Sequence, residues 1–320
     1  MPELPEVETT RAALAPYVMQ QRIKRLLIRC ERLRWPIDPK LDHYLSGQII
    51  NNITRRGKYL LLHMANGTLL IHLGMSGRLC LFNKNMPAGK HDHVDIVLEN
   101  GSCIRLRDPR RFGAVLWTTV NPLSHVLLAR LGPEPLSKEF TTDYLWQKIQ
   151  SRRLPIKSVI MDSKIVVGVG NIYANEALFH ARIHPLRMAK DVSKIDCKRL
   201  VSAIRRTLKL AIAQGGTTLR DFASSNRVLE KPADGEQQQD ASVHSPGAYI
   251  GVCEEASTDA TPLMPIAVGF STNSNVQAGY FQQQLQVYGR AGENCFKCQT
   301  VLTLTRIAQR ATVFCTRCQN

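Results

Sequence analysis

Four cysteines near the end of the chain constrain its structure more than any other feature. Cys295, Cys298, Cys315 and Cys318 form the pattern C-x2-C-x16-C-x2-C. Two such pairs, each on its own tight turn, can bring four thiolates onto one tetrahedral zinc ion. Because cysteine fills all four coordination positions, the pattern predicts one structural zinc ion and not a catalytic one. A redox or chance pairing is the alternative.

The remaining cysteines follow no pairing pattern. The total of nine is odd, and the N-terminal sequence MPELPEVETT is acidic and rich in proline, unlike a secretory or mitochondrial leader. We therefore expect a reducing compartment and no disulfide framework. The five scattered cysteines have no role that the sequence assigns: Cys30, Cys80, Cys103, Cys197 and Cys253.

The charge of the chain points to an anionic partner. Lys and Arg number 42 against 26 Asp and Glu, so the net charge is +16. This favours nucleic acid over a membrane surface, and no apolar run reaches the ~18–20 residues of a membrane span. Residues 228–276 carry a net charge of −6 and the rest of the chain +22. That acidic window predicts a disordered insertion, with a short hairpin as the alternative.

The first third of the chain has the pattern of antiparallel β structure. Apolar runs meet at Asn66-Gly67 and again at Asn100-Gly101. Asn-Gly between such runs is a strong hairpin signal, because both residues accept positive φ. Together with an earlier apolar run over residues 22–29, these hairpins predict a sandwich or barrel.

Helical patterns follow the loop LGPEP at residues 131–135. Asn171 is the predicted N-cap of the helix IYANEALFHA. A longer helix is predicted over Val192–Gln214, ending at Gly215-Gly216. Its predicted apolar face consists of Ile195, Leu200, Ile204, Leu208 and Ala211. The fold class expected from these patterns is α+β.

The first residues carry the chemistry of an amine nucleophile. Removal of Met1 would expose the secondary amine of Pro2, and an α-amino group has a pKa near 8 against about 10.4 for lysine. Such an amine can attack a sugar C1′ and form a Schiff base, with Glu3 in reach as acid or base. The alternative is that Pro-Glu-x-Pro-Glu only begins a helix.

Basic residues in the predicted hairpins suit contact with DNA. Lys58 precedes a strand and can bind phosphate or move protons, although a solvated strand end is the plainer interpretation. The turn RLRDPRRFG combines dense positive charge with one aromatic residue, Phe112. That combination suits phosphate contact and insertion into a base stack, with an exposed hairpin end as the alternative.

Ten motifs in order along the chain resemble those of one family. They are PELPEVET, GKYLL, IHLGMSG, KHDHVD, DPRRFG, GPEP, VVGVGNIYANE, QGGTTLRDF, GYFQQQLQVYGR and, within the four-cysteine segment, AQRAT. Together they resemble bacterial formamidopyrimidine-DNA glycosylase, the bacterial 8-oxoguanine DNA glycosylase with AP lyase activity. The resemblance covers essentially the whole chain except the acidic window.

This resemblance implies four parts. We expect an N-terminal antiparallel β-sandwich domain over 1–135, a helix–two-turn–helix domain over 136–226, an acidic insertion in the lesion-capping loop over 227–278 and a C-terminal zinc finger over 279–320. The expected partner is double-stranded DNA that contains oxidised purines or abasic sites, bound in a cleft between the two halves. The family also implies a monomer in the bacterial cytoplasm at the nucleoid, without membrane contact or a redox cofactor.

The resemblance also implies roles for single residues. Pro2 matches the nucleophile, Glu3 the acid that assists base departure, Lys58 the residue of β-elimination and Arg310 a phosphate ligand assigned to δ-elimination. Glu6 matches a residue of the lesion pocket. The remaining matches are to DNA contacts: His72 and Asn171 as phosphate clamps, Met75, Arg110 and Phe112 as the trio that fills the vacated stack, and His91 and Arg152 as further contacts. A target base must leave the duplex before its sugar can be attacked, and inserted side chains offset the cost.

Two other functions remain open at this point. An endonuclease VIII-like glycosylase shares the nucleophile and the zinc finger but prefers oxidised pyrimidines; Leu4-Pro5 and the wedge trio favour the purine-lesion enzyme. A non-catalytic zinc-ribbon DNA-binding protein is the other alternative, against which the intact Pro2, Glu3 and Lys58 speak.

The acidic insertion generates the first prediction. Deleting residues 227–278 removes negative charge beside a DNA cleft, so we expect tighter DNA binding at low salt and an intact lyase step. Binding titrations and borohydride trapping measure the two effects. Unchanged affinity would indicate a passive surface loop, and lost trapping would refute the second expectation.

Overall fold

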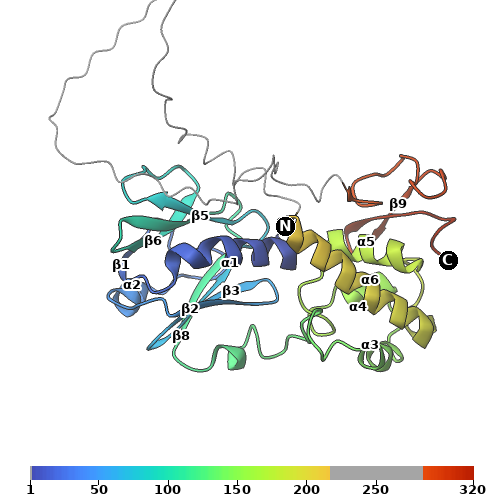
Figure 1. Cartoon of the computed structure of the whole chain (residues 1–320), viewed down its shortest axis with the longest axis horizontal. Helices are drawn as coiled ribbons and strands as arrows, with labels where there is room; N and C mark the ends of the chain where they lie inside the picture. Colours follow the sequence, from blue (N-terminus) through green and yellow to red (C-terminus); the bar gives the residue numbers. More distant parts are fainter. Residues whose placement is uncertain (1, 217–283) are drawn as a thin grey trace, which may run out of the picture.

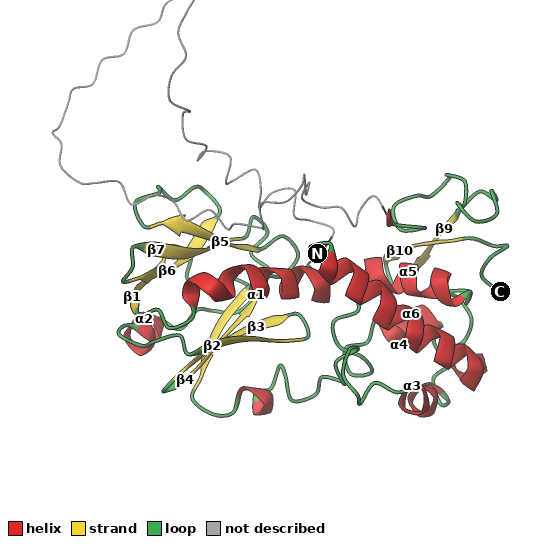
Figure 2. Cartoon of the chain, in the orientation of Figure 1, coloured by secondary structure: helices red, strands yellow, loops and turns green. Residues whose placement is uncertain are grey.

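The computed structural model describes residues 2–216 and 284–320. The predicted acidic insertion, residues 227–278, lies outside the described residues. The strands of two sheets gather in one half of the described molecule, and most helices gather in the other (Figure 2). Within the described ranges, no helix has both the length and the apolar character that crossing a bilayer requires.

Two antiparallel four-stranded sheets form the N-terminal half, which confirms the predicted sandwich. The first has the order β1 (Ile23–Ile28), β6 (Asp92–Leu98), β7 (Ser102–Arg107), β5 (Arg78–Asn83). The second has the order β2 (Asn52–Arg56), β3 (Tyr59–Met64), β4 (Gly67–His72), β8 (Ala114–Thr118). Helix α1 (Leu4–Val18) contributes Val7, Leu14 and Val18 to the hydrophobic core of this half. The short helix α2 (Leu41–Leu45) packs beside β1.

The two Asn-Gly signals locate real hairpins, but for different physical reasons. Gly101 has the expected positive φ of 84°. Gly67 does not: it is the first residue of β4 and pairs with Met64, so the turn itself is Ala65-Asn66. A Cβ at Gly67 would lie 2.4 Å from the carbonyl oxygen of Thr118. The glycine is therefore required there by the close approach of β8.

The second half consists of packed helices after a linker that contains the 3₁₀ turn η1 (Pro122–Ser124). The helices are α3 (Thr142–Ile149), α4 (Ile156–Ile160), α5 (Asn171–Ala181) and α6 (Lys194–Ala213), with the 3₁₀ turn η2 (Ala189–Asp191) before α6. The predicted long helix is thus confirmed, and Ser193 caps it by accepting the Asp196 N–H. Its predicted apolar face is wrong at Ile195, which is 74% exposed. Ile195 precedes Leu200 by five residues, which turns it about 140° away from the buried face.

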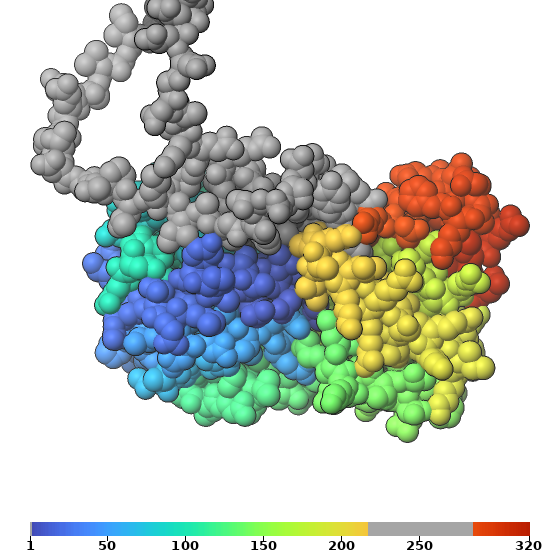
Figure 3. All heavy atoms as spheres, in the orientation of Figure 1, coloured from blue at the N-terminus to red at the C-terminus, as the bar shows by residue number. Residues whose placement is uncertain are grey.

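The C-terminal zinc-finger segment packs on α5, as the red and yellow-green surfaces of Figure 3 show. Its strands β9 (Thr303–Ile307) and β10 (Arg310–Phe314) form an antiparallel hairpin. Phe179 of α5 shares a hydrophobic cluster with Val313 of β10. The buried Glu176 carboxylate accepts the backbone N–H groups of Gln286, Val287 and Tyr288 at 2.8, 2.9 and 2.9 Å. One acidic side chain of the helical half thus holds the segment that leads into the finger.

This contact can be tested by substitution. Glu176→Ala leaves three N–H groups, one buried and two partly buried, without their charged acceptor, so we expect the free energy of unfolding to fall by about 2–4 kcal/mol. Chemical denaturation measures the change. Glu293→Ala is the control, because Arg290 is the single ion-pair partner of that exposed carboxylate among the residues that the structure describes. Equal stability of the two variants would contradict the interpretation.

Candidate active site and nucleic-acid interface

The start of the chain lies at the junction of the two halves (Figure 1), where Glu3 contacts the start of α5. The Glu3 side chain is 1% exposed, and its carboxylate accepts the N–H of Gly170 at 2.7 Å and of Ile172 at 2.9 Å. The predicted N-cap at Asn171 is therefore wrong: Gly170 is the N-cap and Asn171 the first helical residue. The backbone N–H groups at the start of α5 that lack a partner within the helix therefore donate to a carboxylate near the N-terminus of the chain.

Two glycines allow this close approach. A Cβ at Gly170 would lie 2.3 Å from Cδ of Glu3, and a Cβ at Gly168 would lie 2.6 Å from Cδ1 of Leu4. Gly168 also has a φ of +87° and accepts the Leu4 N–H at 3.1 Å. The motif VVGVGN thus provides a surface on which the first residues fit without side-chain interference.

Charged groups from distant segments meet beside Glu3. Burial raises the pKa of Glu3, opposed by the positive charge of Lys58. Burial lowers the pKa of Lys58, opposed by Glu3 and Glu6 and assisted by the charge of Arg310. Glu6 accepts the Glu3 N–H at 2.9 Å and the Tyr173 hydroxyl at 2.6 Å. The structure thus brings together Glu3, Glu6, Lys58 and Arg310, with Pro2 half-buried next to them in the chain.

Lys58 follows a turn that Glu134 holds in place. The Glu134 carboxylate accepts the Gly57 N–H at 2.7 Å and forms ion pairs with Arg55 at 2.7 Å and Arg56 at 3.0 Å. From the sequence, Glu134 was expected only as part of the loop GPEP, and this role was missed. A charged residue between two prolines is the sole local signal, and its partners are nearly 80 residues away.

Arg310 begins β10 directly after a turn in which Ala308 and Gln309 both have positive φ, 46° and 62°. The hairpin is anchored by Lys157, whose Nζ donates to the Ala311 carbonyl at 2.9 Å and to Oγ1 of Thr312 at 2.7 Å. Burial and the neighbouring Arg310 lower the pKa of Lys157 to about 8. Lys157 was not among the site residues predicted from the sequence.

Asn171, a predicted phosphate clamp, also lies at this junction. Its Nδ2 donates to the Ala311 carbonyl at 3.1 Å, whereas its Oδ1 is buried without a hydrogen-bond partner in the described structure. Arg152 is exposed on the turn after α3, and no hydrogen bond among the described residues joins its side chain to the charged cluster. The structure thus places one of these two predicted contacts beside Arg310 and leaves the other on the surface.

The predicted wedge residues lie on two adjoining loops. The first loop follows β4 and carries Met75, and the second follows β7 and carries Arg110 and Phe112. Met75 and Phe112 are large apolar side chains that are each 41% exposed. The exposed Arg110 guanidinium lies 5.0 Å from the centre of the Phe112 ring. His72, at the end of β4, leads into the first loop, and the carbonyl of His91 accepts the Asp108 N–H at the base of the second. The arrangement presents aromatic, thioether and cationic groups together.

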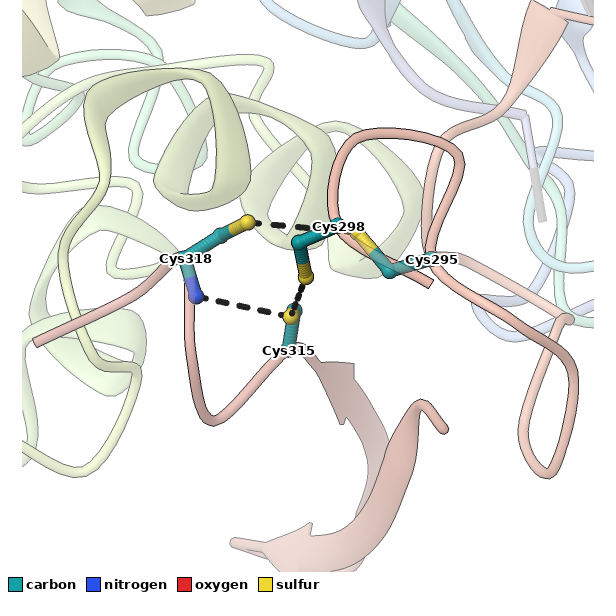
Figure 4. Close-up of side chains that lie close together, drawn as sticks. All are labelled: Cys295, Cys298, Cys315 and Cys318. Atoms are coloured by element: carbon teal, nitrogen blue, oxygen red, sulfur yellow. Dashed lines mark hydrogen bonds between the residues drawn. The ribbon is translucent and has the colours of Figure 1, made fainter. Parts of the chain in front are cut away.

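The four C-terminal cysteines converge from two turns (Figure 4). Their Sγ atoms all lie within 4.8 Å of one another, with Cys298 and Cys315 3.4 Å apart and Cys295 and Cys318 4.0 Å apart. Tetrahedral Zn–S bonds of about 2.3 Å place sulfur atoms about 3.8 Å apart. The cluster therefore fits a metal ion of this size and geometry.

Comparison with known proteins agrees with this fold. The formamidopyrimidine-DNA glycosylase N-terminal domain model matches residues 1–115, and the H2TH domain model of the same family matches residues 131–223. The formamidopyrimidine-DNA glycosylase of Stutzerimonas stutzeri is 47% identical over 319 residues, which cover 100% of both chains. That of Pseudomonas fluorescens is 47% identical over 320 residues, again with 100% of both chains covered.

Solved structures give the same result. The crystal structure of the MutM (Fpg) protein from Thermus thermophilus has a TM-score of 0.73 at 30% identity and covers 99% of this chain and 98% of its own. The Lactococcus lactis enzyme in complex with Fapy-dG DNA has a TM-score of 0.77 at 26% identity and covers 99% of this chain and 100% of its own. The fold and the site define a DNA glycosylase of base repair. The chain belongs to the formamidopyrimidine-DNA glycosylase family.

His72 provides a test of the site's electrostatics. Its Nδ1 accepts the Gly74 N–H at 3.0 Å, and burial, with the charges of Lys58 and Arg34, lowers its pKa to about 4. We expect the ring to stay neutral from pH 5 to 8 with its proton on Nε2, where it can donate a hydrogen bond.

An NMR titration of the ring nitrogens measures this directly. A midpoint near 4 is the expected result. A midpoint near 6.5, the ordinary value for histidine, would contradict it.

Proposed function

We propose that this glycosylase is bifunctional and excises oxidised purines, including 8-oxoguanine and formamidopyrimidines, before it cleaves the strand by β,δ-elimination. The observation that carries the proposal is the buried Glu3 carboxylate at the start of α5, which follows Pro2 in the chain and lies close enough to Lys58 for their charges to interact. A secondary amine next to a carboxyl group of raised pKa and a lysine of lowered pKa is suited to Schiff-base chemistry.

The proposed reaction begins once Met1 has been removed. The Pro2 nitrogen attacks C1′ of the flipped nucleotide, and the glycosidic bond breaks as the base leaves with a proton. Glu3 then helps to protonate O4′ as the C1′–O4′ bond of the sugar ring breaks, which leaves an imine between Pro2 and C1′. The resulting imine draws electrons from C2′, so that Lys58 can accept a C2′ proton while the bond from C3′ to its phosphate oxygen breaks. Loss of the second phosphate, assisted by Arg310, and hydrolysis of the imine restore the free amine.

The burial of Lys58 supports this proton transfer. Because burial lowers its pKa, a larger fraction of the amine is neutral at pH 7 than in an exposed lysine. The carboxyl group of Glu3 is shifted in the opposite direction, which favours the protonated form needed by an acid. A carboxyl group and an amine whose pKa values are both shifted toward neutrality in this way can serve as acid and base in one site.

We assign the DNA contacts to both halves. His72, Asn171, Lys58 and Arg310 would bind phosphates around the flipped nucleotide, with His91 and Arg152 as outer contacts and Glu6 lining the lesion pocket. Met75, Arg110 and Phe112 would fill the vacated stack, and Arg110 would face the orphaned cytosine. The similar Lactococcus lactis structures contain Fapy-dG or abasic-site DNA, which supports duplex DNA with such lesions as the partner. We further propose that the enzyme acts as a monomer, with the domain boundaries given above.

The four cysteines would hold one structural zinc ion. Thiolate ligands at tetrahedral spacing are typical of such sites, and the ion would stabilise the finger that carries Arg310 without taking part in the reaction. Elemental analysis should find one zinc per chain. DNA binding by a purified protein without zinc would contradict this role.

Borohydride trapping tests the proposed function. A duplex with one 8-oxoguanine opposite cytosine should give a covalent adduct, whereas Pro2→Gly and an undamaged duplex should give little or none. Replacing the secondary amine of proline with the primary amine of glycine should lower the trapped fraction at least tenfold, because it alters the nucleophile.

A second substrate distinguishes the alternatives. A thymine glycol duplex trapped faster than the 8-oxoguanine duplex would indicate an endonuclease VIII-like specificity. No adduct on either duplex, with Met1 shown to be removed and zinc bound, would indicate a DNA-binding protein without this chemistry.

A further inference from the structure

Asp108 is a fully buried carboxylate (0% exposed) that bonds to both loops of the wedge. Its Oδ1 accepts the hydroxyl of Ser76 at 2.7 Å. Its Oδ2 accepts the Gly113 N–H at 2.7 Å, and the Arg110 N–H lies 3.3 Å from Oδ1. Ser76 follows Met75 in the first loop, while Arg110 and Gly113 enclose the end of the second.

The two loops also touch directly. Gly74 has a φ of +64°, and a Cβ there would lie 2.4 Å from the backbone carbon of Phe112. The Arg110 N–H lies 3.2 Å from the Ser76 hydroxyl oxygen. The backbone at Asp108 adds three further bonds. Its N–H donates to the His91 carbonyl at 2.9 Å, and its carbonyl accepts from Nε2 of His93 at 2.9 Å and from the Arg111 N–H at 3.1 Å. Any relative movement of the loops would disturb this group of contacts.

The charge of Asp108 makes these contacts favour one arrangement of the two loops over others. Within the described residues, no ion pair involves its carboxylate; its hydrogen-bond donors are the Ser76 hydroxyl and the N–H groups of the second loop. The guanidinium of Arg110 points instead to the Phe112 ring. A buried anion that loses hydrogen bonds pays a large desolvation cost, so the carboxylate favours the one arrangement in which the loops satisfy it.

We propose that Asp108 is a positioning residue that couples the two loops, so that Met75, Arg110 and Phe112 enter the base stack as one preformed unit. Ser76 is the hydroxyl that joins the first loop to it. The proposal rests on the proposed function, because it assigns the wedge to the opening of the duplex. A preformed wedge loses less conformational entropy on insertion than three independently moving side chains.

The variant Asp108→Asn tests the coupling on two substrates. An amide presents an NH₂ group to at least one donor that the carboxylate accepts, so the bond between the loops is weakened. Excision from duplex DNA should slow about tenfold or more, the effect expected when a hydrogen bond to a charged group is lost. The same lesion in a single strand needs no opening of a stack, and its excision should slow by no more than about threefold.

Matched controls separate positioning from general damage to the fold. Asp42 and Ser46 form the same carboxylate–hydroxyl contact at 3.0 Å in and after α2. Asp42→Asn and Ser46→Ala should change both rates equally or not at all. Ser76→Ala keeps the buried carboxylate and should reproduce the selective duplex defect if Asp108→Asn does not fold. Adding Asp108→Asn to Phe112→Ala should cause little further loss on duplex DNA.

A readout independent of excision completes the test. A duplex with a tetrahydrofuran site and a neighbouring 2-aminopurine reports insertion by fluorescence. We expect the rise on binding to be reduced in Asp108→Asn and Ser76→Ala and unchanged in Ser46→Ala. A full rise in both loop variants, or equal slowing on duplex and single strand, would overturn the coupling. If the wild-type protein inserts into the duplex but excises the lesion from neither the duplex nor the single strand, the result would contradict the proposed function and leave the coupling intact.

Discussion

The carboxylate of Glu3 accepts backbone N–H groups at the start of α5, and the arrangement of the site depends on this contact. The first N–H groups of a helix have no partner within the helix and carry its positive dipole end, so they stabilise a buried anion. The same burial raises the pKa of Glu3. This interaction therefore joins the β-sandwich to the helical half and holds the first residues of the chain, with a carboxyl group of raised pKa, at their junction.

The two cationic residues near Glu3, Lys58 and Arg310, are also positioned by side chains from other segments of the chain. Glu134, in the loop after the linker, holds the turn before Lys58. Lys157 and Asn171, from the helical half, hold the hairpin that begins with Arg310. These contacts make the site a product of the assembled halves. Neither half by itself contains both the amine of Pro2 and the surface that fixes it.

Local patterns predicted the parts of the fold that local interactions determine. Cysteine spacing located the cluster of four thiols, turn signals located two hairpins, and periodicity located α6. The N-cap of α5 was wrongly assigned to Asn171. The side chain that accepts the N–H groups at the start of α5 is that of Glu3, which lies 167 residues from Gly170 in the sequence and gives no local signal there. Glu134, Lys157 and Asp108 were missed for the same reason, since their partners are distant in sequence or on another loop. The roles predicted for Pro2 and Lys58 came from the resemblance to a family, because residue type alone also fits a helix start and a strand end.

Amide hydrogen exchange at the start of α5 tests the central contact most directly. N–H groups in the first turn of a helix ordinarily exchange fast, so slow exchange at Ile172 requires an acceptor such as Glu3. Glu3→Ala should speed exchange at Gly170 and Ile172 about tenfold or more and leave Asp196, capped by Ser193, unchanged. Fast exchange in the unaltered protein, or equal exchange in both, would contradict the account.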